Sequence, residues 1–108
     1  MTVKGRPCQS EIRKNILEIL LFLNKGYGYQ ISKVYNEIFP KVSQRSVYYH
    51  LRKGVQLQEL TLNKIELEEG NFSWGKQVEK TYYSLGKKAT PKGLPRVKEY
   101  LDRYLNPQ

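Results

Sequence analysis

The sequence predicts a mainly helical α+β domain in which three helices precede a β-hairpin and a final helix. Apolar residues recur at helical spacing in four segments, and strand-like residues flank a turn-rich stretch at 70–75. A length of 108 residues suits one domain with a modest core. The predicted organisation is a basic arm over 1–9, a folded domain over 10–85, and a basic turn with a helix over 86–108.

The first predicted helix begins at Ser10, the expected N-cap, with Glu11 favourably placed at the positive end of the helix. Asn24, Gly26 and Gly28 are expected to end it, because these residues tolerate the left-handed conformation found just past helix ends. Its buried stripe repeats every three or four positions and comprises Ile12, Ile16, Ile19, Leu20 and Leu23, widened by Leu17 and Leu21.

Two shorter helices are expected next. One runs from about Tyr29 to Pro40, which disfavours helix at the residue before it. The other has Ser43 as N-cap and runs to about Lys53, where Gly54 is the expected stop. Their inward residues are Ile31, Val34, Tyr35 and Ile38 in the former, and Val47 and Leu51 in the latter.

A hairpin and a last helix complete the pattern. Strands are expected at 64–69 and 76–84, with a bulge near Asn63 where the apolar alternation changes phase. Pro95 suits the first turn of the final helix. Three helices followed by a hairpin make the winged form of the helix-turn-helix. Since an isolated hairpin is only marginally stable, this wing must lean on the helical core.

The charge balance indicates a polyanionic partner. Nineteen Lys and Arg residues against ten Asp and Glu residues leave a net charge of +9, which is typical of domains that bind nucleic acid. A basic protein without such a partner is the plainer alternative. The single Cys8 cannot form an internal disulfide, and we find neither a signal-peptide pattern nor a membrane-spanning apolar run. The expected location is therefore the cytoplasm, in association with the nucleoid.

No pattern in the sequence favours catalysis. It contains no Cys and His cluster with metal-ligand spacing and no Walker-type glycine loop, and the lone His50 has no evident nucleophile or carboxylate partner. A histidine next to a core position is more often structural, with a pH-sensitive contact as the alternative. We expect a protein that is not an enzyme and has no cofactor and no metal site.

The third predicted helix carries the candidate DNA-binding surface. Arg45 can present two donors to guanine O6 and N7, and Gln44 can pair with adenine N6 and N7, each worth about 1–3 kcal/mol of discrimination. Arg52 and Lys53 suit phosphates, which position the protein without specifying sequence. Tyr49 has an alternative use, packing against the second helix. The side chains expected to contact DNA here are Ser43, Gln44, Arg45, Tyr48, Tyr49, Arg52 and Lys53.

The wing tip and the N-terminal arm extend this surface. Trp74 can press on a sugar or enter the minor groove while Lys76 bonds a phosphate, or Trp74 can fold back onto the hairpin. Lys4 and Arg6 belong to Lys-Gly-Arg-Pro, which approximates the Arg-Gly-Arg-Pro core of AT-hook arms that enter narrow A·T-rich minor grooves. A plain N-terminal extension is the alternative for the arm.

Four short motifs, in order, resemble PadR-like winged-helix transcriptional regulators. Gly28-Tyr-Gln-Ile31 is similar to their Gly-Tyr-Glu-Ile element, and Val47-Tyr48 with Leu51 is similar to their recognition helix. Residues 79–85 resemble the second wing strand, and residues 90–93 resemble the turn before their last helix. The opening Gly-Arg-Pro, with Ser-Glu-Ile-Arg after it, is also similar to small archaeal winged-helix regulators.

The resemblance implies a sequence-specific regulator of transcription that binds double-stranded DNA. Its recognition helix would lie in the major groove and its wing on the flanking backbone or minor groove. A winged-helix module that binds protein or RNA is the alternative, because a fold alone does not determine function. The residues identify no small-molecule effector.

Family members dimerise through the last part of the chain, so the resemblance also implies a homodimer. The candidate contact stripe can instead cover the chain's own core. It comprises Leu94, Val97, Leu101 and Leu105.

Overall fold

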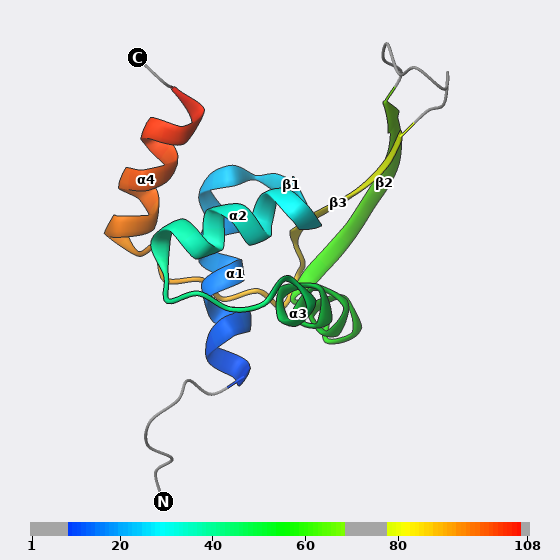
Figure 1. The fold of residues 1–108 in the computed structure, drawn as a ribbon. Coiled ribbons are helices and arrows are strands. Elements are labelled where there is room, and N and C mark those ends of the chain that lie inside the picture. The colour runs from blue at the N-terminus through cyan, green and yellow to red at the C-terminus, as the bar shows by residue number, and fades with distance from the viewer. Residues whose placement is uncertain (1–8, 69–77, 107–108) are drawn as a thin grey trace, which may run out of the picture.

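Helix α1 (Gln9–Leu23) runs through the middle of the molecule, and the other helices pack around it (Figure 1). The structure is a computed structural model that describes residues 9–68 and 78–106. Within them the remaining elements are β1 (Lys25–Tyr27), α2 (Gly28–Ile38), α3 (Gln44–Gln56), β2 (Leu60–Glu68), β3 (Val78–Leu85) and α4 (Pro95–Leu105). This mainly helical arrangement is the winged helix that the sequence predicts.

The apolar stripe predicted for α1 forms the centre of the core, where Ile16 and Ile19 have no exposed surface. Burial of such a side chain contributes about 1.5–3 kcal/mol, so α1 is the main source of cohesion. The helix begins at Gln9, so Ser10 lies inside its first turn. The prediction that Ser10 is the N-cap is therefore wrong. The buried residues that meet α1 from the other helices include Ile31, Val34, Tyr35, Val47, Leu51, Val97 and Leu101.

Asn24 ends α1 as predicted, with a left-handed φ of 77°. The two glycines after it act differently from the prediction, because neither has a positive φ. Both are buried where β1 and the start of α2 approach other elements. Because neither glycine has a side chain, the neighbouring elements can approach the backbone closely at both positions.

Strand β1 is an element that the sequence does not predict. It has three residues, too few to show an alternating pattern, and its partner lies more than fifty residues away. Gly26 pairs with Tyr83 in an antiparallel ladder, and the sheet order is β1-β3-β2. The hairpin is therefore joined to the helical core through β1.

Strands β2 and β3 confirm the predicted hairpin with shifted ends. The register slips between Leu62 and Ile65, where the sequence predicts a bulge. β2 begins at Leu60, four residues before the predicted strand, because Leu60 pairs with Leu85 and is almost fully buried. The predicted hairpin tip lies outside the described residues.

Helix α3 continues past its predicted end, so Gly54 is not a helix stop. α3 runs to Gln56, and the left-handed φ of 65° belongs to Gln58. A Cβ at Gly54 would lie 2.7 Å from Leu60 Cδ1. The glycine is therefore required for close packing of α3 against the start of β2.

The turn before α4 is fastened to α1 by one buried carboxylate. Glu18 is 5% exposed and accepts backbone N–H groups from Lys92 at 2.6 Å, Gly93 at 2.8 Å and Leu94 at 3.0 Å. Hydrogen bonds to a charged acceptor are stronger than neutral ones, so Glu18 holds the N-terminus of α4 in place.

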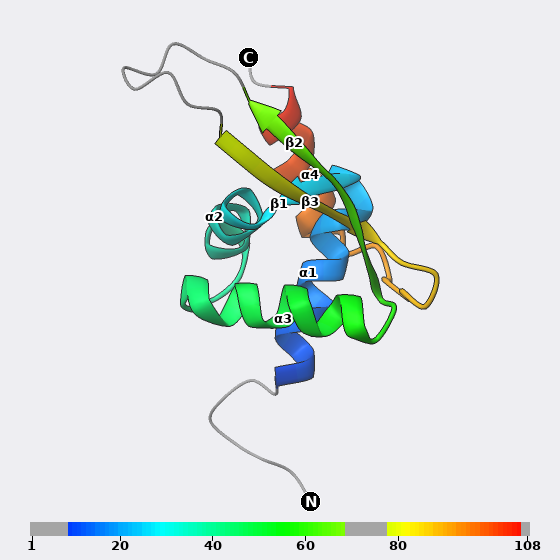
Figure 2. The ribbon, with the colours of Figure 1, turned by 90° about the vertical axis from the view of Figure 1, so that its right-hand side faces the viewer.

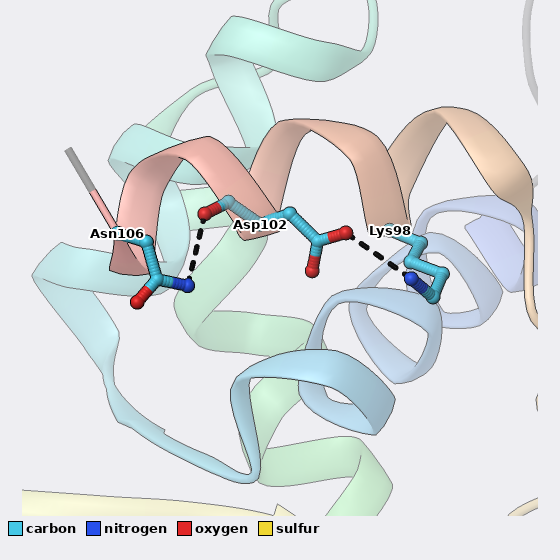
Figure 3. Close-up of polar contacts among 3 residues, drawn as sticks. All are labelled: Lys98, Asp102 and Asn106. Atoms are coloured by element: carbon cyan, nitrogen blue, oxygen red, sulfur yellow. Dashed lines mark hydrogen bonds and ion pairs between the residues drawn. The ribbon is translucent and has the colours of Figure 1, made fainter. Parts of the chain in front are cut away.

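The outer face of α4 is polar. Lys98 Nζ lies 3.1 Å from Asp102 Oδ2, and Asn106 Nδ2 donates to the Asp102 carbonyl oxygen at 3.3 Å (Figure 3). Pro95 occupies the first turn as predicted. The apolar inner face of α4 packs on α1, and this polar face lies opposite.

Replacement of Glu18 by Gln is expected to destabilise the fold. The amide keeps one acceptor oxygen and places N–H donors against the N–H groups of the turn, so the free energy of unfolding should fall by about 2–3 kcal/mol. Urea titration measures the change. Glu99→Gln, at an exposed position of α4, is the matched control and should change stability by less than about 0.5 kcal/mol. Equal stability of the two variants would contradict the role of Glu18.

Candidate nucleic-acid interface

Helix α3 and the β2–β3 hairpin lie on the same side of the helical bundle in both ribbon views (Figures 1 and 2). Val47 and Leu51 turn inward and have no exposed surface. Burial of these two residues determines which side chains of α3 face outward.

Four of the residues predicted to bind DNA line one shallow hollow on the outer side of α3. They are Gln44, Arg45, Tyr48 and Arg52. Arg45, Tyr48 and Arg52 follow Gln44 by one, four and eight positions. This spacing keeps all four side chains along one helix face. All four are exposed, so the hollow presents two guanidinium groups, an amide and a phenol to solvent.

The ends of α3 hold the other polar residues. Ser43 is the N-cap, as predicted, and its Oγ accepts the Ser46 N–H at 3.1 Å. Its side chain remains exposed beside Gln44. Lys53 is half-buried in the last turn, where a positive charge suits the negative end of the helix.

Tyr48 is seated against the start of α2. A Cβ at Gly28 would lie 2.6 Å from Tyr48 Cζ, so only glycine leaves room for this ring. Gln44 Nε2 also donates a long hydrogen bond of 3.5 Å to Tyr48 Oη. Tyr48, and not Tyr49, is thus the tyrosine that reaches the second helix.

Tyr83 of β3 does not line the hollow, but it interacts electrostatically with two residues that do, and the sequence does not single it out. Burial is the main cause that raises the pKa of Tyr83; the Tyr48 hydroxyl adds to this and the Arg52 guanidinium opposes it. Tyr83 pairs across the sheet with Gly26, which has no side chain. This pairing follows from strand β1, which the sequence does not predict.

Tyr49 and His50 lie on different sides of α3. Tyr49 is 44% exposed, whereas His50 is 1% exposed. Their rings meet edge to face with centroids 5.0 Å apart. Tyr49 thus remains available to a partner, and His50 has the structural position expected of a histidine beside the core.

The environment of His50 disfavours its protonated form. Its Nδ1 meets no hydrogen-bond partner among the described residues. Burial is the first cause that lowers its pKa, and the positive charge of Arg13 is the second. Arg13 Nε is itself paired with Glu59 Oε1 at 2.8 Å.

Other predicted residues lie apart from the hollow. Leu94 is half-buried, and Val97 and Leu101 have no exposed surface because they form part of the chain's own core. Leu105, at the end of α4, is 49% exposed. The four predicted contacts of the arm and wing lie outside the described residues; they are Lys4, Arg6, Trp74 and Lys76.

Over residues 9–68 and 78–106, no helix combines the length and the apolar character needed to cross a membrane. The same residues contain no group of three or more His, Cys, Asp or Glu side chains placed to hold a metal ion.

Stability is expected to depend on pH through His50. Because its pKa is lowered from 6.5 in the folded state, the unfolded chain binds the proton more readily, and stability should fall as pH drops below about 6.5. Urea unfolding between pH 7.5 and 5.5 measures this slope. His50→Leu should flatten the slope, and a variant with the wild-type slope would contradict the assignment to His50.

The fold is similar to that of known proteins, although no protein-family model and no curated protein matches the sequence. The structure of smu.1704 from Streptococcus mutans UA159 aligns with a TM-score of 0.53 at 16% identity, over 95% of this chain and 84% of that one. A PadR family transcription regulator from hypervirulent Clostridium difficile R20291 aligns with a TM-score of 0.50 at 21% identity, over 87% and 82%. The predicted resemblance to PadR-like winged helices is confirmed for the fold.

Proposed function

We propose that this chain is a sequence-specific regulator of transcription that binds double-stranded DNA. The observation that carries the proposal is the hollow on α3, where Gln44, Arg45, Tyr48 and Arg52 meet on a helix held firmly by its opposite face. The fold shared with a PadR family transcription regulator supports it. The net charge of +9 supports a polyanionic partner.

In the proposed complex α3 enters the major groove. Gln44 and Arg45 stand in its first turn, the part of a recognition helix that reads base edges most often. Arg52 lies two turns further on and contacts a phosphate. Tyr48 lies between them, with its ring against Gly28 and its Oη accepting a hydrogen bond from Gln44 Nε2.

The hairpin and the arm would contact the flanking DNA. β2 and β3 leave the bundle on the side of α3, so the segment between them, with Trp74 and Lys76, would follow the backbone or the adjacent minor groove (Figure 2). Lys4 and Arg6 would enter an A·T-rich minor groove. With these contacts the protein would be cytoplasmic and associated with the nucleoid.

The chain is proposed to act as a homodimer through the outer end of α4. Tyr104 is 41% exposed and Leu105 is 49% exposed, so both side chains are accessible to a second copy of the chain. Val97 and Leu101 hold α4 on its own chain and leave this end available. A two-fold dimer predicts an operator with two related half-sites.

Binding to duplex DNA is expected to weaken steeply with salt. If each bound unit neutralises about six phosphates, the logarithm of affinity should fall with the logarithm of salt concentration at a slope of about −5. Fluorescence anisotropy with a duplex selected from a random pool measures it. A slope near zero would count against phosphate contacts, and failure to select any sequence would count against specific recognition.

Arg45 and Arg52 are expected to play different roles. Arg45→Gln removes a bidentate contact to guanine, so the preference for the selected duplex over an unrelated one should fall by about 5- to 150-fold. Arg52→Gln should weaken both duplexes alike and reduce the salt slope by about 1. Both residues are exposed on the same helix, which makes the two variants matched. Identical behaviour of the pair would contradict the division between base and phosphate contacts.

A further inference from the structure

A groove of about 420 Å³ between α2 and α4 is lined mainly by tyrosines. Its lining comes from one face of α2, from α4 and from the last residue of β1. The α2 residues recur every four positions, which keeps them along one side of the helix. The side chains on which the groove's chemistry depends are Tyr27, Tyr29, Lys33, Glu37, Tyr100 and Tyr104.

The aromatic rings of this groove are accessible and ordered. Tyr29 is 52% exposed and Tyr104 is 41% exposed. The rings of Tyr104 and Tyr100 are stacked, with an interplanar angle of 22° and centroids 6.0 Å apart. Gln30 Nε2 donates to Tyr104 Oη at 3.3 Å, which links α2 to α4 across the groove. Exposed aromatic faces of this kind suit stacking with nucleobases.

Lysines stand beside the rings. Lys33 Nζ lies 5.9 Å from the centroid of the Tyr29 ring. On β1, Lys25 Nζ lies 4.9 Å from the centroid of Tyr82, and Tyr82 meets Tyr27 edge to face at 5.6 Å. Both lysines are exposed. Because the lysine stem is flexible, each ammonium group can turn to a phosphate while a base stacks on the ring.

This surface faces away from the hollow on α3. Successive side chains of a strand point to opposite faces of the sheet, so Tyr82 and Tyr83 lie on different faces of β3. Tyr83 is the one that interacts electrostatically with residues of the hollow. Helix α2 lies between α3 and α4 (Figure 1). Its Gly28 receives the Tyr48 ring of α3, whereas Tyr29 lines the groove. A ligand in the groove therefore leaves the hollow open.

Glu37 limits where an anionic ligand can place its charge. Burial is the first cause that raises the pKa of Tyr100, and the Glu37 carboxylate is the second, so negative charge acts on the α4 side of the groove. Phosphates would therefore lie at Lys33 and Lys25, with the bases on the rings. The net charge of +9 adds a general attraction for a polyanion.

We propose that this groove, with the adjoining face of β1 and β3, binds single-stranded nucleic acid independently of the duplex site proposed on α3. Aromatic rings with lysines between them are typical of surfaces that hold single strands without sequence preference, because every base has a face that can stack. Tyr29 with Lys33 holds one nucleotide, and Tyr82 with Lys25 holds another.

Fluorescence anisotropy with labelled decauridylate and decathymidylate tests the site, and the tighter of the two identifies the strand as RNA or DNA. The variants lie on α2, because Tyr104 also belongs to the proposed dimer contact. Tyr29→Ala removes a stacking face and should weaken binding about 5- to 150-fold. Tyr49→Ala, at a position of α3 that is 44% exposed, is the matched control and should bind like wild type. Thermal unfolding verifies that each variant is folded.

The phosphate contact has its own readout. Lys33→Gln should reduce the slope of log affinity against log salt by about 0.7, since one phosphate of a single strand is no longer neutralised. Lys14→Gln, at an exposed position of α1, is the matched control and should keep the wild-type slope. Equal slopes of these two variants, or equal affinities of Tyr29→Ala and Tyr49→Ala, would overturn the site.

Two competitors test the location and the class of ligand. Excess selected duplex should leave the oligonucleotide bound to the wild-type chain, and its displacement would place the single strand in the hollow and overturn a second site. A decaproline peptide is the other competitor, since aromatic grooves also hold polyproline helices. Binding of this peptide through Tyr29, without binding of either oligonucleotide, would overturn the nucleic-acid assignment.

The outcome is separable from that of the proposed function. If no duplex binds, the proposed function fails, whereas the titrations with single strands still decide whether the groove holds nucleic acid. Duplex binding without any affinity for either oligonucleotide would overturn the groove site alone.

Discussion

The burial of one face of α3 is the constraint on which the rest of the structure depends. Val47 and Leu51 have no exposed surface, and each contributes about 1.5–3 kcal/mol through removal from water. A helix held in this way cannot rotate without exposing them. The side chains that line the hollow are therefore held outward, and the chemistry of the hollow follows from packing on the opposite side; they are Gln44, Arg45, Tyr48 and Arg52.

Close approach of backbone to side chain sets the position of α3 along its own axis. Gly28 admits the Tyr48 ring near the first half of the helix, and Gly54 admits Leu60 near its end. A side chain at either glycine would force these elements apart, because packed interiors have few voids to absorb a methyl group. Two glycines that suggested helix ends are thus packing sites that join α3 to α2 and to β2.

Much of the fold was predictable because its determinants are local. The stripes of α1, α3 and α4 and the phase change near Asn63 are visible over a few turns or strand residues. Strand β1 was not predictable, since three residues carry no period and their hydrogen bonds go to Tyr82, Tyr83 and Ser84. The end of α3 was misplaced for a similar reason: glycine within a helix looks like a stop until Leu60 is placed against it.

By itself the sequence determined the order of the four helices and the hairpin, the inward residues Val47 and Leu51 of α3 and the polar side chains on its outer face, because periodicity assigns faces within one helix. Only the tertiary structure decided that Tyr48 is the tyrosine seated on α2, that Tyr83 pairs with Gly26, and that Val97 and Leu101 belong to the chain's own core. Each of these depends on residues distant in the chain, and their proximity arises only when the helices pack together.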